Sequence, residues 1–194
     1  KLTVGPDNAD IGPITMPAQI DTIRRHIDDA LAHGAHAPLG GPDAIQPPYV
    51  HPTILTNVPP DAAAVQEETF GPTLTITRVA TTDEAITHAN NTRYGLGAAV
   101  FAKRNATTIA RQLRTGMVAI NSVLSFTAVA GLPYGGVGDS GFGRTHGDDG
   151  LREFSRSQSI ARRRGRSPLP TMTFERTPAQ VARIARMIRR IYGR

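Results

Sequence analysis

Apolar side chains repeat with a helical period near the start of the chain. Between residues 20 and 31 they recur at i, i+3, i+7, i+10 and i+11, which form one face of a helix with 3.6 residues per turn. These positions are Ile20, Ile23, Ile27, Ala30 and Leu31. Gly34 follows as a candidate C-terminal cap. The pattern predicts an amphipathic helix that buries this apolar face.

Strand and helix patterns alternate through the middle of the chain. Residues 73–79, where threonines alternate with apolar residues, are typical of a strand, and so are the apolar runs 96–101 and 117–121. We expect 96–101 to be buried. Helical patterns lie between the strands, over 82–90 with acids in its first turn, and after a capping Asn105. This order predicts an α/β fold with a right-handed parallel βαβαβ sheet.

Proline and glycine restrict the interpretation of two further segments. The β-rich run 49–55 contains Pro52, which predicts an edge or bulged strand. Residues 136–141 fit the pattern G-x-G-x-x-G letter for letter. A dinucleotide-binding turn needs a strand before this pattern and a helix opening at it, whereas Pro133 precedes it and a poor helix former follows. We therefore do not assign a cofactor fingerprint to this run.

Charge divides the chain unevenly. Residues 156–194 contain 11 arginines and one acid, a net charge of +10, whereas the first 155 residues contain 11 basic and 15 acidic residues, a net charge of −4. Such asymmetry indicates a basic tail with an acidic or anionic partner. It does not favour a domain that binds nucleic acid over its whole surface, and we expect no nucleic-acid partner.

The basic tail ends in a second amphipathic pattern. Thr177 is a candidate cap, Pro178 stands at the first helical position, and apolar residues recur on one stripe. This stripe comprises Val181, Ile184, Ile188 and Ile191, and arginines occupy the other faces. A basic amphipathic helix can lie on an anionic membrane surface. The alternative, which is the usual role of such a stripe and the one we favour from the sequence, is that it docks on this protein or on a sister subunit.

The absence of certain residues excludes some classes of site. The chain has no cysteine, which rules out disulfides and thiolate metal sites. His33 and His36 have no third ligand nearby, so we predict two exposed histidines and no metal site. There is no secretory h-region and no apolar run long enough for a membrane span, so we expect a cytoplasmic location. The first residue is not methionine, which suggests a piece of something longer.

Residues 66–72 combine two adjacent carboxylates with an aromatic ring before a Gly-Pro turn. A carboxylate can accept hydrogen bonds from both hydroxyls of a ribose diol, and a ring two residues on offers a flat apolar wall. In the alternative interpretation, Phe70 plugs the core and Glu67 and Glu68 face water. The run by itself allows both.

Two stretches resemble the signatures of the aldehyde dehydrogenase superfamily. They are Glu67-Glu68-Thr69-Phe70-Gly71-Pro72 and, downstream, Leu132-Pro133-Tyr134-Gly135-Gly136-Val137-Gly138-Asp139-Ser140-Gly141-Phe142-Gly143-Arg144. The resemblance covers about residues 10–162 and corresponds to the C-terminal part of the catalytic domain. It implies that Glu68 holds the nicotinamide ribose and that Phe70 packs beside the nicotinamide, so both are cofactor-binding candidates for NAD or NADP.

The resemblance also suggests where substrate would lie. In this family the loop between residues 121 and 133 helps to wall the substrate tunnel, which makes Leu124, Phe126 and Tyr134 candidate lining residues. A core role is the alternative for each of them. Overall likeness points to the succinate-semialdehyde dehydrogenases, and hence to succinic semialdehyde as the aldehyde.

The resemblance implies a division of the chain into three parts. Residues 1–154 would be the C-terminal part of the catalytic domain, and 155–163 an oligomerisation strand that pairs with a neighbouring subunit's sheet. Residues 164–194 would be a basic linker and the amphipathic helix. We therefore expect a homo-oligomer in the intact enzyme.

Two functions remain open. The family nucleophile is a cysteine, and this chain has none, nor does it match the cofactor-binding half of the family. We therefore predict a C-terminal segment of an NAD(P)-dependent aldehyde dehydrogenase that is inactive without its missing N-terminal half and has no catalytic residue of its own. The alternative is a non-catalytic remnant that serves as an oligomerisation or anionic-surface-binding module.

Overall fold

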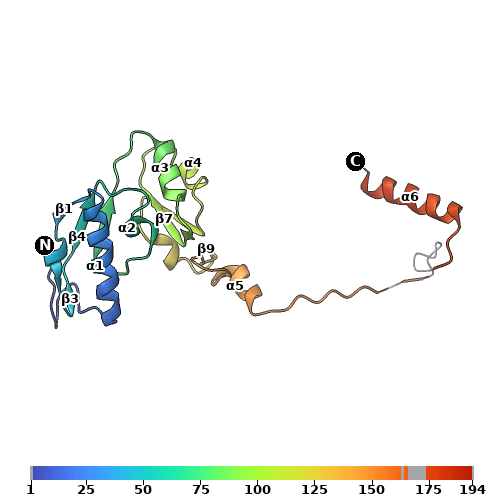
Figure 1. Cartoon of the computed structure of the whole chain (residues 1–194). Helices are drawn as coiled ribbons and strands as arrows, with labels where there is room; N and C mark the ends of the chain where they lie inside the picture. Colours follow the sequence, from blue (N-terminus) through green and yellow to red (C-terminus); the bar gives the residue numbers. More distant parts are fainter. Residues whose placement is uncertain (1, 163, 166–173, 194) are drawn as a thin grey trace. The chain divides into compact units, whose positions relative to one another are not determined.

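A computed structural model describes residues 2–162, 164–165 and 174–193, which fall into two compact units, 1–155 and 156–194. The first unit is an α/β structure (Figure 1). Its elements are α1 (Pro17–Ala32), β1 (His36–Leu39), a 3-10 turn η1 (Pro42–Ala44), β2 (Ile45–Gln46), β3 (Tyr49–Val50), β4 (Thr53–Thr56), α2 (Ala63–Gln66), β5 (Thr73–Ile76), α3 (Thr82–Asn90), β6 (Tyr94–Gly95), β7 (Gly97–Val100), α4 (Ala106–Ala110), β8 (Met117–Ile120), a 3-10 turn η2 (Ser125–Ala128), β9 (Val137–Gly138) and α5 (Gly147–Glu153).

Helix α1 forms where the apolar period predicts it. Ile20, Ile23, Ile27 and Ala30 are buried on one face, and Gly34 follows the helix with φ of 90°, a left-handed conformation that suits glycine. The buried face packs with Val50, Leu55 and other apolar residues into the main core. Figure 1 shows α1 beside β1 and β4. The core of this region therefore lies between α1 and the adjoining sheet.

The sheet beside α1 has the strand order β1-β4-β5, with β1 antiparallel and β5 parallel to β4. Pro52 separates β3 from β4. Strand β3 pairs only with β2 and is an edge strand as expected, whereas β4 is the central strand of its sheet, so the expectation was wrong for the part after Pro52. The chain meets the proline restriction by placing Pro52 just before β4 begins. Strand β5 lies at the edge, and its Leu74 and Ile76 side chains are exposed.

The predicted continuous βαβαβ sheet is divided in two. Strands β7 and β8 pair in parallel around α4, but β5 pairs with β4 and not with β7. Only Val100 of β7 is buried, so the prediction of a buried strand over 96–101 was also wrong. A parallel pair is normally covered on both faces. Phe126 and Tyr134 pack with Met117 and Ala119 of this pair, and α4 contacts both of its strands.

Strands β6 and β9 form a short antiparallel pair. Val137 and Gly138 form β9, and no helix opens at the G-x-G-x-x-G run, which agrees with the rejection of a dinucleotide fingerprint. Asn105 precedes α4 but makes no side-chain cap, so the expected cap was wrong.

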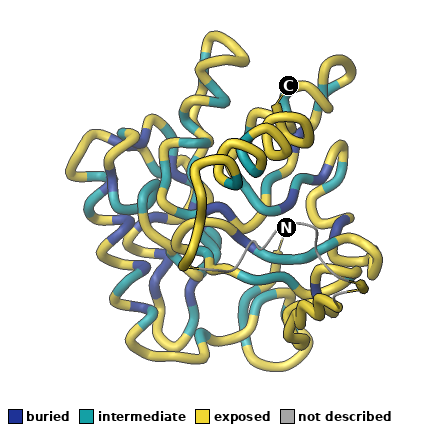
Figure 2. Tube along the Cα trace, turned by 90° about the vertical axis from the view of Figure 1, so that its right-hand side faces the viewer, coloured by how far each residue is buried: buried dark blue, intermediate teal, exposed yellow. Residues whose placement is uncertain are grey.

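The second unit contains α6 (Pro178–Tyr192). Residues 155–162 form no strand, so the expected oligomerisation strand over 155–163 is not formed within the described residues; residue 163 lies outside them. A strand needs a hydrogen-bonded neighbour, and the described part of this chain gives it none. Of the predicted linker, the structure describes residues 164–165 and 174–177. Figure 2 shows that buried positions belong to the first unit.

None of the helices in the described part of the chain has the length and apolar character needed to cross a bilayer.

Candidate functional site: the loop from Glu67 to Pro72

The loop between α2 and β5 contains both carboxylates and the ring that the sequence singles out. Helix α2 ends at Gln66, and β5 begins at Thr73 in register with Thr53 of β4. The backbone N–H of Thr53 donates to the carbonyl of Pro72 over 2.9 Å. The end of the loop is therefore fixed to the central strand.

Helix α1 holds the loop from the other side. The Arg25 guanidinium donates to Glu67, with 2.6 Å between Nη2 and Oε2, and Nε2 of His26 lies 3.2 Å from the same oxygen. His26 is fully buried, and its Nδ1 lies 2.9 Å from Oγ1 of Thr69. Gln19 donates to the Thr69 carbonyl. Glu67 and Thr69 thus have structural roles.

These contacts define the tautomer of His26 when its ring is neutral. An ionised carboxylate only accepts hydrogen bonds, so Nε2 must carry the proton that it shares with Glu67. Nδ1 then accepts from the Thr69 hydroxyl. One buried ring consequently fixes two loop residues that are two positions apart.

The Arg25 hydrogen bond, followed by that of His26, lowers the pKa of Glu67 from 4.5 to about 2. Because the folded pKa lies below the unfolded one, the stability that this ion pair contributes is present above pH 4.5 and is lost as the pH falls through about 2. We therefore expect the stability difference between the wild type and Glu67→Gln to shrink over that range. Denaturant midpoints measured for both proteins across this pH range test this.

Asp28→Asn is the matched control, because Asp28 is an exposed acid of α1 with no hydrogen bond within the described residues. If the two substitutions changed stability with the same pH dependence, the anchoring role of Glu67 would be wrong.

Close packing behind the loop requires a glycine at position 71. A Cβ on Gly71 would lie 2.5 Å from Cδ1 and 2.8 Å from Cγ1 of the buried Ile23. Phe70, just before it, has a φ of 42°, which is unusual for a bulky residue. The tight approach to α1 at Gly71 and this turn at Phe70 direct the chain so that the Phe70 side chain is 77% exposed.

Glu68 and Phe70 are the residues that the loop leaves open. Glu68 is exposed and makes no hydrogen bond or ion pair within the described residues. Phe70 lines a hollow of about 390 Å³ with five residues of the segment that leads into α1 and its first turn. These are Pro13, Ile14, Thr15, Met16 and Gln19. Glu68 does not line this hollow, and Phe70 does not plug the core.

The three candidate substrate-lining residues occupy different environments. Phe126 is buried with Met117 and Ala119, so it takes the core role that the sequence left open. Tyr134 is half-buried, and its ring centroid lies 6.3 Å from that of Phe126. Leu124 is 60% exposed. No hydrogen bond, ion pair or ring contact in the described part of the chain joins them to Glu68 or Phe70.

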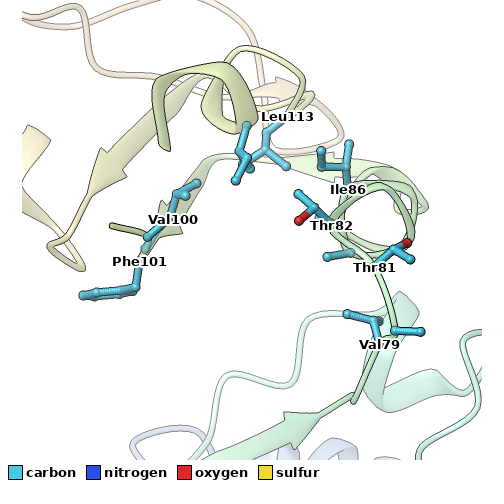
Figure 3. A pocket seen from close by; sticks show the side chains of 13 residues that line it. Val79, Thr81, Thr82, Ile86, Val100, Phe101 and Leu113 are labelled. Carbon is cyan, nitrogen blue, oxygen red and sulfur yellow. The ribbon is translucent and has the colours of Figure 1, made fainter. Parts of the chain in front are cut away.

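A separate hollow of about 540 Å³ lies among α3, β7 and α4 (Figure 3). Its lining includes Ile86, Val100 and Leu113, and the polar side chains in it are the hydroxyls of Thr81 and Thr82. Phe101 is at its margin, and Figure 3 shows its ring directed away from the other labelled side chains. With no ionisable group in its lining, this hollow offers no acid or base for catalysis.

Three residues of this site were absent from the sequence-based prediction. Gln19, Arg25 and His26 all belong to α1 and reach the loop from there. Position 26 follows Ile23 by three residues and precedes Ala30 by four, so it falls on the apolar face of the helix. A histidine on that face needs buried partners, and this was the available signal. As for metals, no three histidine or acidic side chains of the described residues gather closely enough to hold an ion.

Comparison with protein families gives one match. The model described as "Aldehyde dehydrogenase family" matches residues 1–160. Among curated proteins, one named "Putative succinate-semialdehyde dehydrogenase 2", NADP(+)-linked, from Mycobacterium tuberculosis is 43% identical over 160 residues, which are 79% of this chain and 31% of that protein. The 4,4'-diapolycopene aldehyde oxidase of a Methylomonas species is 41% identical over 171 residues, 87% of this chain and 32% of that protein.

Solved structures give the same picture. Betaine aldehyde dehydrogenase from Staphylococcus aureus in complex with NAD+ superposes with a TM-score of 0.69 at 34% identity, covering 79% of this chain and 32% of that one. Aldehyde dehydrogenase C from Pseudomonas syringae, complexed with NAD+ and octanal, gives a TM-score of 0.72 at 32% identity, covering 79% and 33%. The chain thus spans about a third of the length of the proteins it matches.

Proposed function

Because this chain belongs to the aldehyde dehydrogenase family, we propose that it is the C-terminal part of the catalytic domain of an NAD(P)-dependent aldehyde dehydrogenase. The intact enzyme would oxidise an aldehyde to a carboxylic acid. The observation that carries this proposal is that two residues of the loop 67–70 are bound to α1 and the other two are exposed. Glu67 and Thr69 bind to α1, whereas Glu68 and Phe70 are exposed and make no hydrogen bond or ion pair through their side chains within the described residues.

The open residues fit a nicotinamide riboside. An exposed, unpaired carboxylate can accept from both hydroxyls of a ribose, and the exposed Phe70 ring offers a flat wall for a planar heterocycle. The left-handed backbone at Phe70 costs about 1–2 kcal/mol, a strain that is found preferentially at ligand sites. When bound, NAD or NADP supplies the acceptor for the hydride. The role of Glu68 and Phe70 is to hold and orient it.

The nucleophile must come from elsewhere. The family uses a cysteine thiolate, and this chain contains no cysteine. A second polypeptide, or a further part of the same one, would therefore carry the thiolate and most of the cofactor site. The exposed apolar side chains of Leu74 and Ile76 on the edge strand β5 are consistent with such a partner.

The substrate would be an aldehyde, and the mycobacterial relative favours succinic semialdehyde as the first to test. Leu124 and Tyr134 remain candidates for the tunnel wall, whereas the burial of Phe126 supports an indirect role beneath it. Residues 155–163 would pair with a neighbouring subunit in a homo-oligomer. The backbone groups of residues 156–162, which make no hydrogen bond within the described residues, are suited to adding a strand to a sheet edge.

Reconstitution tests the proposal. The chain is mixed with a separately produced nucleophile- and cofactor-binding part of the mycobacterial relative, and absorbance of NADPH is followed with succinic semialdehyde. We expect activity only in the mixture. Glu68→Gln should raise the KM for NADP+ by about tenfold to a hundredfold, because hydrogen bonds to a charged group contribute about 1.5–3 kcal/mol.

Asp28→Asn removes an exposed acid at a distance in the sequence and should leave this KM unchanged. If every mixture stayed inactive although a complex formed, the proposed dehydrogenase function would be wrong. If Glu68→Gln and Asp28→Asn changed the KM for NADP+ alike, the assignment of Glu68 would be wrong. A complex that forms but shows no activity would support the alternative, a non-catalytic module.

A further inference from the structure

Helix α6 separates its side chains by chemistry around its axis. At 3.6 residues per turn, seven of its apolar side chains fall within an arc of about 160° that also holds Gln180, and its four arginines fall within an opposite arc of about 120° that also holds Ala179 and Ala182. The apolar group comprises Val181, Ile184, Ala185, Met187, Ile188, Ile191 and Tyr192, and the arginines are Arg183, Arg186, Arg189 and Arg190. No acid interrupts either arc.

Local residues are enough to specify this helix. The Gln180 backbone N–H donates to the Thr177 hydroxyl over 3.3 Å, and the Thr177 backbone N–H donates to Oε1 of Gln180 over 2.9 Å, which forms a complete capping box. Pro178 occupies the first turn, and Arg189 and Arg190 oppose the dipole at the other end. The helix also lies beyond the family match, which ends at residue 160. The shared dehydrogenase fold therefore does not account for it.

Within the described residues of its own unit, the apolar face of α6 has no cover. Val181 and Ile188 are about half exposed, Ile191 is 63% exposed, and no residue of the helix is buried. Isoleucines on a face without cover favour a partner that removes them from water.

We infer that α6 binds to the surface of an anionic lipid bilayer. A helix with a strongly basic face, an apolar face and low net hydrophobicity lies in the plane of the interface with its apolar side in the acyl boundary. Long arginine side chains beside that boundary reach back to the anionic headgroups. The charge supports this partner, because residues 156–194 carry a net +10.

A coiled coil fits the helix less well. Val181, Ile184, Ile188 and Ile191 do follow a heptad spacing, but for two repeats only, whereas stable coiled coils sustain three or four. The flanking positions that would carry interhelical ion pairs hold Ala185, Met187 and Tyr192. Nucleic acid is also disfavoured, because phosphate contacts would leave the apolar face unused.

Sedimentation of the full chain with vesicles tests the inference. We expect binding to phosphatidylcholine vesicles that contain about 30% phosphatidylglycerol, little binding to phosphatidylcholine alone, and weaker binding at about 0.5 M salt. Each arginine near an anionic surface contributes roughly a fivefold change in affinity, so Arg186→Gln with Arg190→Gln should weaken binding about 25-fold.

A second pair separates apolar insertion from charge. Ile184→Gln with Ile188→Gln keeps the net charge and should weaken vesicle binding at least tenfold. The matched control is Arg78→Gln with Arg104→Gln, two exposed arginines of the first unit, and it should bind as the wild type does. Circular dichroism of each protein verifies that the helix is retained.

Three results would overturn the inference. The first is vesicle binding that survives the isoleucine pair or falls equally with the control pair. The second is duplex DNA that binds as tightly as vesicles and depends on the α6 arginines alone. The third, measured without lipid, is a thermal midpoint of the first unit or a molar mass in solution that changes with the isoleucine pair, which would mean that α6 packs on the protein or on a second copy.

Discussion

Gly116→Ala is expected to lower the free energy of unfolding of the first unit by about 3 kcal/mol or more, the upper end of what overpacking costs. Gly116 precedes β8, and its backbone N–H donates to the Gly95 carbonyl over 3.0 Å. A Cβ here would overlap the Gly135 carbonyl oxygen and would lie 2.9 Å from its carbon. Backbone atoms cannot rotate away, so β8 or the glycine-rich run must move. Denaturant unfolding of the substituted chain measures the loss.

Gly131→Ala provides the comparison. A Cβ at Gly131 would meet nothing within 4 Å, so this substitution in the neighbouring loop should change stability by no more than about 0.5 kcal/mol. Equal losses at the two positions would show that the approach of Gly116 to Gly135 does not limit the fold.

His26→Ala is expected to have an effect of similar size, about 3–5 kcal/mol, because it removes a fully buried ring and leaves its partners unsatisfied. The Thr69 hydroxyl would lose its hydrogen bond, and the Glu67 carboxylate would keep only Arg25. His26 does not reach the exposed side of the loop, so we class it as a positioning residue. In the reconstituted enzyme, the KM for NADP+ should rise while kcat changes less.

His33→Ala is the matched control on the same helix, since the His33 side chain is exposed and bonds only to Asp29 within the described residues. It should cost less than 1 kcal/mol and leave the KM for NADP+ unchanged. A loss of stability without any change in that KM after His26→Ala would limit His26 to a role in the core.

Local patterns predict the local parts of this structure well. The period of Ile20, Ile23, Ile27 and Ala30 predicts α1 because burial of one helical face leaves a direct trace in the sequence. The same holds for the Thr177 cap of α6. Strand pairing leaves a weaker trace, because it joins segments far apart in the chain. For this reason the sequence did not predict that β5 pairs with β4 and that the expected βαβαβ sheet is divided.

The candidate site shows the same contrast. Resemblance identifies the loop of Glu68 and Phe70, and the structure leaves both residues exposed. The supports of that loop depend on long-range contacts, such as His26 with Thr69, 43 residues apart. No short motif contains such a pair. Phe126, in turn, lies in an apolar loop whose sequence gives no sign of whether it faces the core or a tunnel.

The edge position of β5 has a practical consequence. An uncovered parallel edge that carries Leu74 and Ile76 is a template for aggregation, because its free backbone groups can recruit the same strand of another molecule. Heterologous production of this chain by itself would therefore favour inclusion bodies. Co-expression with the complementary polypeptide would hide that edge before intermolecular sheets could grow.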